Sequence, residues 1–202
     1  MLVDRFYPIV DSVDWVKRFV PLGARFIQLR IKDASDEVVR RQITEAQNIC
    51  QSTGATVVVN DYWRAAIDLG CDYVHLGQED LASADIAAIA RAGIRLGVST
   101  HDEDELETAL SADPNYVALG PVYPTILKKM KWAPQGLDRV GVWKQKIGNL
   151  PLVAIGGMTV TRAPGVFAAG ADSIAVVTDI LLAEDPDRRL GQWLASVAEK
   201  AA

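Results

Sequence analysis

Short apolar segments alternate with amphipathic segments eight times along this chain of 202 residues. The run at 56–59 is nearly continuous in β-branched residues, which is typical of a strand buried on both faces. Strands are predicted at residues 6–10, 25–31, 56–61, 73–77, 95–100, 116–120, 152–157 and 173–178. Helices are predicted between them, at 15–20, 35–54, 62–67 and 84–90, from 102 onward, at 140–147 and 161–170, and from 186 onward.

This alternation predicts a parallel sheet, because each helix returns the chain to the start of the next strand. Eight units of about 25 residues favour a closed (β/α)8 TIM barrel over an open doubly wound sheet. No Gly-x-Gly-x-x-Gly follows the first predicted strand, as a dinucleotide-binding sheet would require. Since the chain has no linker and no low-complexity segment, we expect a single α/β TIM-barrel domain over residues 1–202.

The composition argues against several classes of partner. Half of the residues are hydrophobic, 23% are charged and the net charge is −5, which does not favour a general surface for nucleic acid or membrane. Cys50 and Cys71 lack metal-binding spacing, so we expect reduced packing residues of a cytoplasmic protein. We expect no signal peptide, and no apolar run approaches the roughly 18 residues that cross a bilayer. The sequence leaves the oligomeric state open.

The strand predicted at 25–31 leads into a row of polar side chains. Gln28, Arg30 and Lys32 share one face, about 7 Å apart at roughly 3.3 Å per residue. An amide, a guanidinium and an ammonium in one row can bind a diphosphate. The alternative is that Arg30 and Lys32 are solvated residues at a frayed strand end. Active sites of TIM barrels lie at the carboxyl ends of the strands, where polar residues of this chain gather.

Asp61 and Asp80 follow the third and fourth predicted strands. Neighbouring strands of a parallel barrel end at the same rim, so the two carboxylates are expected to face the cationic row. Mg²⁺ takes one or two protein carboxylates together with phosphate oxygens and water. The structural alternative is that each carboxylate caps the helix that follows it. Asp61 and Asp80 are therefore candidate Mg²⁺ ligands.

The seventh predicted strand ends in Gly156 and Gly157. The loops after the last two strands of a TIM barrel commonly bind phosphate through backbone N–H groups, although a glycine turn without a ligand is the alternative. His75 lies within a strand, where packing is the commoner role, and His101 either faces the site or starts a helix. The aromatic residues are scattered and are interpreted as core. No spacing indicates a Ser-His-Asp or Cys-His arrangement.

Six motifs in order resemble the thiamine phosphate synthase family over almost the whole chain. They are QLRIKD at 28–33, VND at 59–61, VHLGQEDL at 74–81, GVSTH at 97–101, GPVYPT at 120–125 and AIGGM at 154–158. A single piece such as the double glycine is a weak signal, whereas the ordered set is specific.

The resemblance implies a transferase of thiamine biosynthesis. It would join 4-amino-2-methyl-5-hydroxymethylpyrimidine diphosphate to 4-methyl-5-(2-phosphoethyl)thiazole, giving thiamine phosphate and pyrophosphate by a dissociative route. Carried over by motif, the pyrimidine diphosphate would contact Gln28, Arg30, Lys32, Asn60, Ser99 and Lys128. The thiazole phosphate would contact Thr125, Gly157, Val177 and Thr178, the last three largely through backbone. Asp61 and Asp80 would hold Mg²⁺, and no residue would act as a general acid or base.

One departure and two rival functions remain. The family often has a second threonine where this chain has Leu127, and the basic loop that follows is a hypothetical lid. A thiazole tautomerase on the same barrel would use a histidine at the position of His101 as acid and base. A catalytically idle phosphate-binding barrel would have a regulatory role. Asp61, Asp80 and the cationic row favour the synthase over both.

Overall fold

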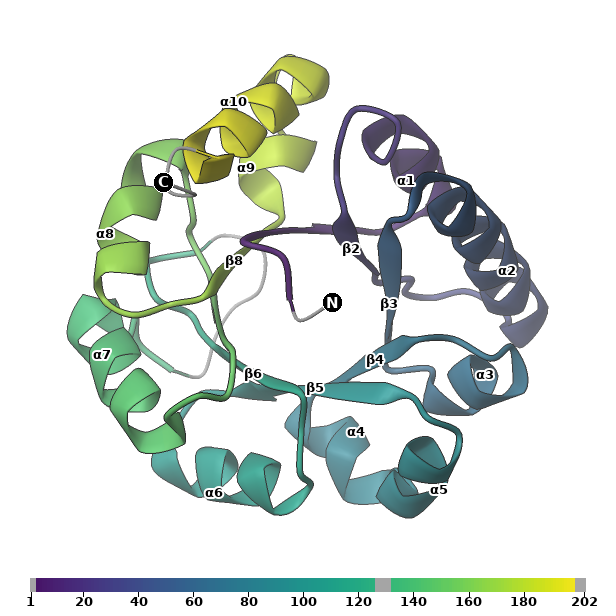
Figure 1. The fold of residues 1–202 in the computed structure, drawn as a ribbon, viewed down its shortest axis with the longest axis horizontal. Helices are drawn as coiled ribbons and strands as arrows, with labels where there is room; N and C mark the ends of the chain where they lie inside the picture. The colour runs from purple at the N-terminus through teal and green to yellow at the C-terminus, as the bar shows by residue number, and fades with distance from the viewer. Residues whose placement is uncertain (1–2, 126–131, 199–202) are drawn as a thin grey trace.

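The computed structural model describes residues 3–125 and 132–198. The eight strands are all parallel and follow one another around a closed barrel in chain order, with β1 paired to β8. Figure 1 shows the strands at the centre and the helices around them. The prediction of a (β/α)8 TIM barrel is therefore confirmed. The strands are β1 Phe6–Val10, β2 Phe26–Leu29, β3 Thr56–Asn60, β4 Tyr73–Leu76, β5 Arg95–Thr100, β6 Tyr116–Leu119, β7 Leu152–Ile155 and β8 Ser173–Val176.

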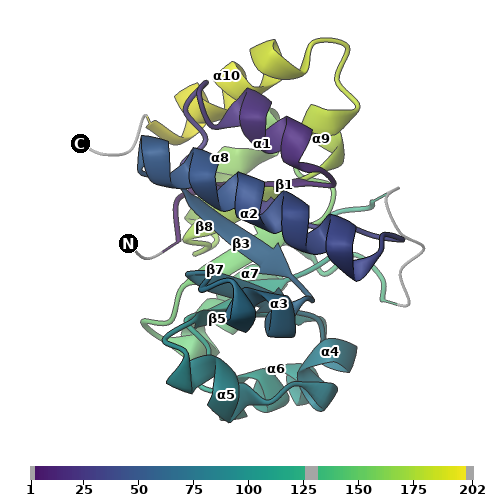
Figure 2. The ribbon, with the colours of Figure 1, turned by 90° about the vertical axis from the view of Figure 1, so that its right-hand side faces the viewer.

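The helices form the outer layer, and in Figure 2 the long helix α2 crosses the outer side of β3. They are α1 Val13–Phe19, α2 Asp36–Thr53, α3 Trp63–Asp68, α4 Gln78–Ser83, α5 Ile86–Arg91, α6 Glu103–Ser111, α7 Gly136–Ile147, the 3₁₀ turn η1 Val160–Arg162, α8 Ala163–Ala168, α9 Thr178–Leu181 and α10 Pro186–Ala198. Across both described ranges, no helix is long and apolar enough to cross a membrane.

Side-chain alternation along the strands gives the barrel two cores. Apolar residues on the outer faces pack under the helices in one large cluster. The inner faces enclose a second, smaller cluster that includes Tyr7, Phe26, Tyr73 and Tyr116. Edge-to-face contacts hold these rings together, with the centroids of Tyr7 and Phe26 4.7 Å apart and those of Phe26 and Tyr73 5.2 Å apart. The aromatic layer supports the carboxyl-end rim, where polar side chains replace apolar ones.

Two short helices at that rim were not predicted. The sequence predicts one helix at 84–90, but α4 precedes it and Ala84 is extended between α4 and α5. Helix α9 follows β8 directly. Each is at most six residues long, so neither has the repeated apolar spacing that identifies a longer helix.

Two predicted helix starts are confirmed, one predicted cap is wrong, and α7 begins at Gly136 rather than at 140. The Ser35 hydroxyl accepts a 3.4 Å hydrogen bond from the Val38 N–H at the start of α2. Pro186 is the first residue of α10, as predicted. Thr161 does not cap α8 as expected, because it lies inside η1, which leads straight into that helix.

Candidate active site

The polar row that follows β2 descends from the surface into the barrel. Lys32 is exposed, Arg30 is half-buried and Gln28 is only 2% exposed. Strand β2 ends at Leu29, two residues before the predicted end, although the Arg30 N–H still donates to the Val10 carbonyl at 2.8 Å. The three residues therefore lie at different depths. The Gln28 amide nitrogen donates to the Tyr7 hydroxyl at 2.8 Å, so the row offers an anion two cations and not three equivalent donors.

The predicted carboxylate pair lies beside this row. The Lys32 ammonium nitrogen is 2.5 Å from Asp61 Oδ2. Asp61 has a left-handed backbone, with φ of 66°, immediately after β3, and it caps no helix. Asp80 is the third residue of α4, whose N-cap position is Gly77. The capping alternative is therefore excluded for both carboxylates.

The electrostatics of the pair suit a hard cation. Partial burial and the adjacent Asp61 carboxylate raise the pKa of Asp80, while Lys32 opposes the rise. Two carboxylates in contact repel each other unless a proton or a cation lies between them. The described parts of the chain contain no group of three or more metal-ligating side chains, but Mg²⁺ needs only one or two carboxylates when phosphate and water complete its shell. The donor set fits such an ion.

The inner faces of β3 to β5 add neutral polar groups at the floor of the rim. Asn60 is 5% exposed, and its amide nitrogen has no hydrogen-bond partner among the described residues. His75, which is 7% exposed, places Nε2 2.8 Å from the Ser99 hydroxyl. Burial lowers the pKa of His75 to about 4, so the imidazole is neutral near pH 7. An unpaired buried amide donor at the floor of the rim is suited to a ligand.

The opposite side of the rim is built from backbone. Gly156 and Gly157 have positive φ values of 98° and 62°. A Cβ on Gly157 would lie 2.4 Å from the Pro124 carbonyl oxygen, and one on Gly156 would lie 2.6 Å from Pro121 Cα. Contact with the segment after β6 therefore requires both glycines, whether or not a ligand binds.

The candidate thiazole-phosphate residues lie along this side. Thr125, Gly157, Val177 and Thr178 are all half-buried. Thr178 begins α9, and the next residue, Asp179, accepts a 2.8 Å hydrogen bond from the Trp193 indole N–H and contacts Arg189. These contacts tie the start of α9 to α10. Lys128, the remaining candidate, lies outside the described residues, as do Leu127 and residues 129–131 of the loop proposed as a lid, whereas Trp132 of that loop is described.

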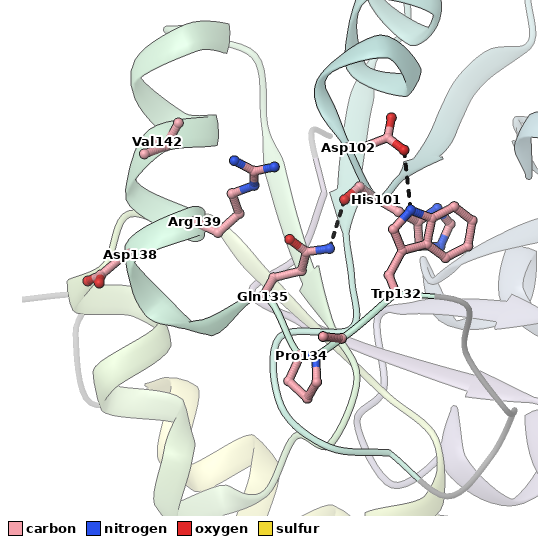
Figure 3. Close-up of a pocket in the computed structure, with 9 residues that line it drawn as sticks. His101, Asp102, Trp132, Pro134, Gln135, Asp138, Arg139 and Val142 are labelled. Atoms are coloured by element: carbon pink, nitrogen blue, oxygen red, sulfur yellow. Dashed lines mark hydrogen bonds between the residues drawn. The ribbon is translucent and has the colours of Figure 1, made fainter.

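His101 lies beside the rim in a separate hollow of about 480 Å³ (Figure 3). Its Nδ1 is 2.6 Å from Glu105 Oε2, and its ring stacks on Trp132 with centroids 4.0 Å apart. Figure 3 also shows Gln135 donating to the His101 carbonyl at 2.7 Å. Among the residues that the structure describes, none of the predicted substrate or metal residues lines this hollow.

Three further residues contribute to the site without being predicted from the sequence. Tyr7 and Tyr116 pack in the inner core as expected for aromatic residues, but their hydroxyls also contact each other and the polar floor. Their inward positions on β1 and β6 are the only sequence signal for this role. Arg162 donates to the Gly157 carbonyl and lies 4.3 Å from the centre of the Tyr123 ring, which braces the glycine turn.

Comparison with known proteins gives the family. The model of the thiamine monophosphate synthase family matches residues 5–180. The chain belongs to that family. A thiamine-phosphate synthase of Rhizobium etli is 60% identical over 98% of this chain and 97% of its own length. One of Escherichia coli is 49% identical over 89% of this chain and 85% of its own length.

Solved structures agree with this assignment. The thiamine phosphate pyrophosphorylase of Pyrococcus furiosus superposes on this family member with a TM-score of 0.86 at 27% identity. The superposition covers 98% of this chain and 97% of the Pyrococcus chain. The fold and the family expected from the sequence are both confirmed.

Proposed function

We propose that this protein synthesises thiamine phosphate in the cytoplasm. It would join 4-amino-2-methyl-5-hydroxymethylpyrimidine diphosphate to 4-methyl-5-(2-phosphoethyl)thiazole and release pyrophosphate. The observation that carries the proposal is the placement of Asp61 and Asp80 against Lys32 at the barrel rim, in a member of this family. An isomerase acting on the thiazole phosphate alone has no need of paired carboxylates beside a cationic row.

The proposed reaction breaks the bond between the pyrimidine methylene carbon and the diphosphate oxygen. Pyrophosphate leaves with the electron pair, and the thiazole nitrogen lone pair forms the new carbon–nitrogen bond, giving a thiazolium. No proton has to be removed from the attacking nitrogen, so no general base is required. The neutral, hydrogen-bonded state of His75 is compatible with this absence of base chemistry.

The side chains around β2 and β3 would bind the pyrimidine diphosphate. Arg30 and Lys32 would stabilise the charge that grows on the leaving group, and electrostatic stabilisation of this kind is typically worth several kcal/mol of barrier. The unpaired Asn60 amide nitrogen would donate to the substrate. Gln28, which lies deeper, would face the pyrimidine ring, and Ser99 would donate from β5. Lys128 belongs to the same proposed set.

Asp61 and Asp80 would hold Mg²⁺ on the same side. The ion, when bound, would neutralise part of the charge on the diphosphate. Lys32 already contacts Asp61, so substrate phosphates entering the rim would share this cation with the carboxylate. The dependence of activity on Mg²⁺ is part of the proposal.

The thiazole phosphate would bind on the backbone side, at Thr125, Gly157, Val177 and Thr178. Backbone N–H groups suit a phosphate because they donate without a flexible side chain to order. The contacts of Arg162 with the Gly157 carbonyl and of Asp179 with α10 would keep these backbone groups in place.

Purified protein given both substrates and Mg²⁺ tests the proposal. We expect thiamine phosphate and pyrophosphate in equal amounts, and neither product when one substrate is omitted. Isomerisation of the thiazole phosphate alone would identify a tautomerase and direct attention to His101. Binding of inorganic phosphate without turnover of either substrate would identify a regulatory barrel.

A further inference from the structure

A continuous chain of hydrogen bonds crosses the interior of the barrel from β5 to β2. The Ser99 hydroxyl is 2.8 Å from His75 Nε2, and His75 Nδ1 is 2.8 Å from the Tyr116 hydroxyl. The Tyr116 and Tyr7 hydroxyls are 2.8 Å apart, and the Tyr7 hydroxyl accepts from the Gln28 amide nitrogen at 2.8 Å. The two ends of the chain, Ser99 and Gln28, are both proposed substrate-binding residues.

The barrel makes room for this chain at Gly97. Gly97 is paired with Tyr116 in the register of β5 and β6, and a Cβ on Gly97 would lie 2.0 Å from Tyr116 Cζ. The Tyr116 ring occupies that space and also stacks on His75, with ring centroids 5.6 Å apart and planes 17° apart. Strand β5 thus has no side chain at the position that the Tyr116 ring occupies.

The available donors and acceptors allow the hydrogen-bond chain to run in only one donor-to-acceptor direction. The Gln28 amide nitrogen can only donate, so Tyr7 accepts there and has to place its own proton on Tyr116. Tyr116 in turn donates to His75 Nδ1, which leaves the imidazole proton on Nε2, pointing at the Ser99 oxygen. The Ser99 hydroxyl proton then has no role inside the chain. The reverse direction leaves the Tyr7 proton without an acceptor in the chain, which is costly for a buried group.

We propose that Tyr7 and Tyr116 are positioning residues that set the protonated nitrogen of His75 and present the Ser99 hydroxyl as a donor and the Gln28 amide oxygen as an acceptor to the pyrimidine diphosphate. The identity of the substrate in this inference rests on the proposed function. The order of the hydrogen bonds does not, because it follows from the free protein alone.

The charge states of the members are consistent with this direction. Burial is the main cause that lowers the pKa of His75 and raises that of both tyrosines, so all three are neutral near pH 7. A neutral imidazole donates through one nitrogen and accepts through the other, as the chain requires. A doubly protonated imidazole would place an N–H at Nδ1 against the Tyr116 hydroxyl proton, so Tyr116 could no longer donate to His75.

Nitrogen-15 NMR of the free protein tests the direction first. The protein has two histidines, so the signals that remain in a His101→Asn variant belong to His75. We expect the proton on Nε2 in the wild-type protein, and a loss of this fixed tautomer in Tyr116→Phe. A proton fixed on Nδ1 would reverse the chain and overturn the proposal, whatever reaction the protein catalyses.

Steady-state kinetics test the positioning role. One unmade hydrogen bond predicts that Tyr7→Phe and Tyr116→Phe each raise KM for the pyrimidine diphosphate about tenfold, with KM for the thiazole phosphate changed less than about twofold. Because both act through one chain, the double variant should be little worse than either single variant. Tyr73→Phe is the matched control, since Tyr73 lies in the same aromatic layer and its hydroxyl contacts Arg95.

The outcomes separate a positioning role from a structural one. Equal KM values in all three phenylalanine variants, with melting temperature as the only change, would show that the hydroxyls stabilise the barrel without aligning the substrate. Absence of any turnover in the wild-type protein would refute the proposed function, and the NMR result would still decide the direction of the chain.

Discussion

The two sides of the barrel rim are built in different ways. Around β2 to β5 the site consists of side chains, with Arg30, Lys32 and the Asp61–Asp80 pair above a buried polar floor. Around β6 to β8 it consists of backbone, with two glycines in contact with the segment after β6 and a short helix after β8. The first side can hold a diphosphate and a metal ion through charge. The second can hold a monophosphate through N–H groups whose geometry depends on close packing.

Replacing Asp80 on the side-chain half should have the largest effect. We expect Asp80→Ala to fold normally, because the substitution removes a carboxylate that Asp61 repels, and to lose activity by at least about 100-fold, since the proposed Mg²⁺ would lose a ligand. Turnover at saturating Mg²⁺ measures the loss. Glu79→Ala is the matched control, because Glu79 is the exposed neighbour on the same turn of α4. Wild-type turnover by Asp80→Ala would contradict the proposed metal site on this side of the rim.

Replacing Arg30 should weaken diphosphate binding. A hydrogen bond to a charged group contributes about 1.5–3 kcal/mol, so Arg30→Ala should raise KM for the pyrimidine diphosphate by roughly 10- to 100-fold. Arg25 stands just before the other end of β2, where its guanidinium donates to the Thr53 carbonyl, and Arg25→Ala should leave that KM unchanged. Equal effects of the two substitutions would mean that overall charge, not position at the rim, governs affinity.

The buried histidine gives the side-chain half of the rim a pH-dependent contribution to stability. The pKa of His75 is about 4 in the folded protein, against 6.5 for an ordinary histidine, so the unfolded chain binds the proton first as the pH falls. Its stabilising contribution is complete above about pH 6.5 and is lost toward pH 4. Urea unfolding should show about 2 kcal/mol less stability at pH 5 than near pH 7.5 from this residue. In His75→Gln that part of the decline should disappear, and an identical decline in both proteins would contradict the assignment.

Two glycines with the same φ separate packing from backbone strain on the other half. Gly157 and Gly70 both have φ of 62°, but a Cβ on Gly70 would meet no atom within 4 Å, whereas one on Gly157 would strike Pro124 and Tyr123. Both alanine variants carry the left-handed backbone cost, and Gly157→Ala adds overpacking of at least about 1 kcal/mol. Chemical unfolding should resolve this difference. Equal destabilisation of the two variants would mean that the turn after β7 shifts enough to accommodate the added methyl group.

The sequence predicts the first half of the rim better than the second. The contact between Asp61 and Asp80 follows from strand order, because neighbouring parallel strands end at one rim. The glycine pair is visible as a motif, but its contact with Pro124 depends on how the segment after β6 folds back. Helix α9, which places Thr178, has too few residues for a periodic signal.

Contacts across the barrel are the least predictable from sequence. Tyr7 and Tyr116 are 109 residues apart, and nothing in their local spacing indicates that their hydroxyls meet. Gly97 belongs to the GVSTH motif, but the motif does not explain why a strand should contain a glycine there. The structure does, because the Tyr116 ring fills the space that a Cβ on Gly97 would occupy. Strand alternation shows which residues face inward, and only the closed barrel determines which of them touch.

Calorimetric binding of each substrate, with Mg²⁺ and then with EDTA, tests the division of the rim most directly. We predict that the pyrimidine diphosphate binds tightly only with Mg²⁺, and that the affinity for the thiazole phosphate is the same in both conditions. Asp80→Ala should reproduce the EDTA result in the presence of Mg²⁺. A pyrimidine diphosphate affinity that is indifferent to the metal, or a thiazole phosphate affinity that depends on it, would contradict the assignment of one substrate to each side.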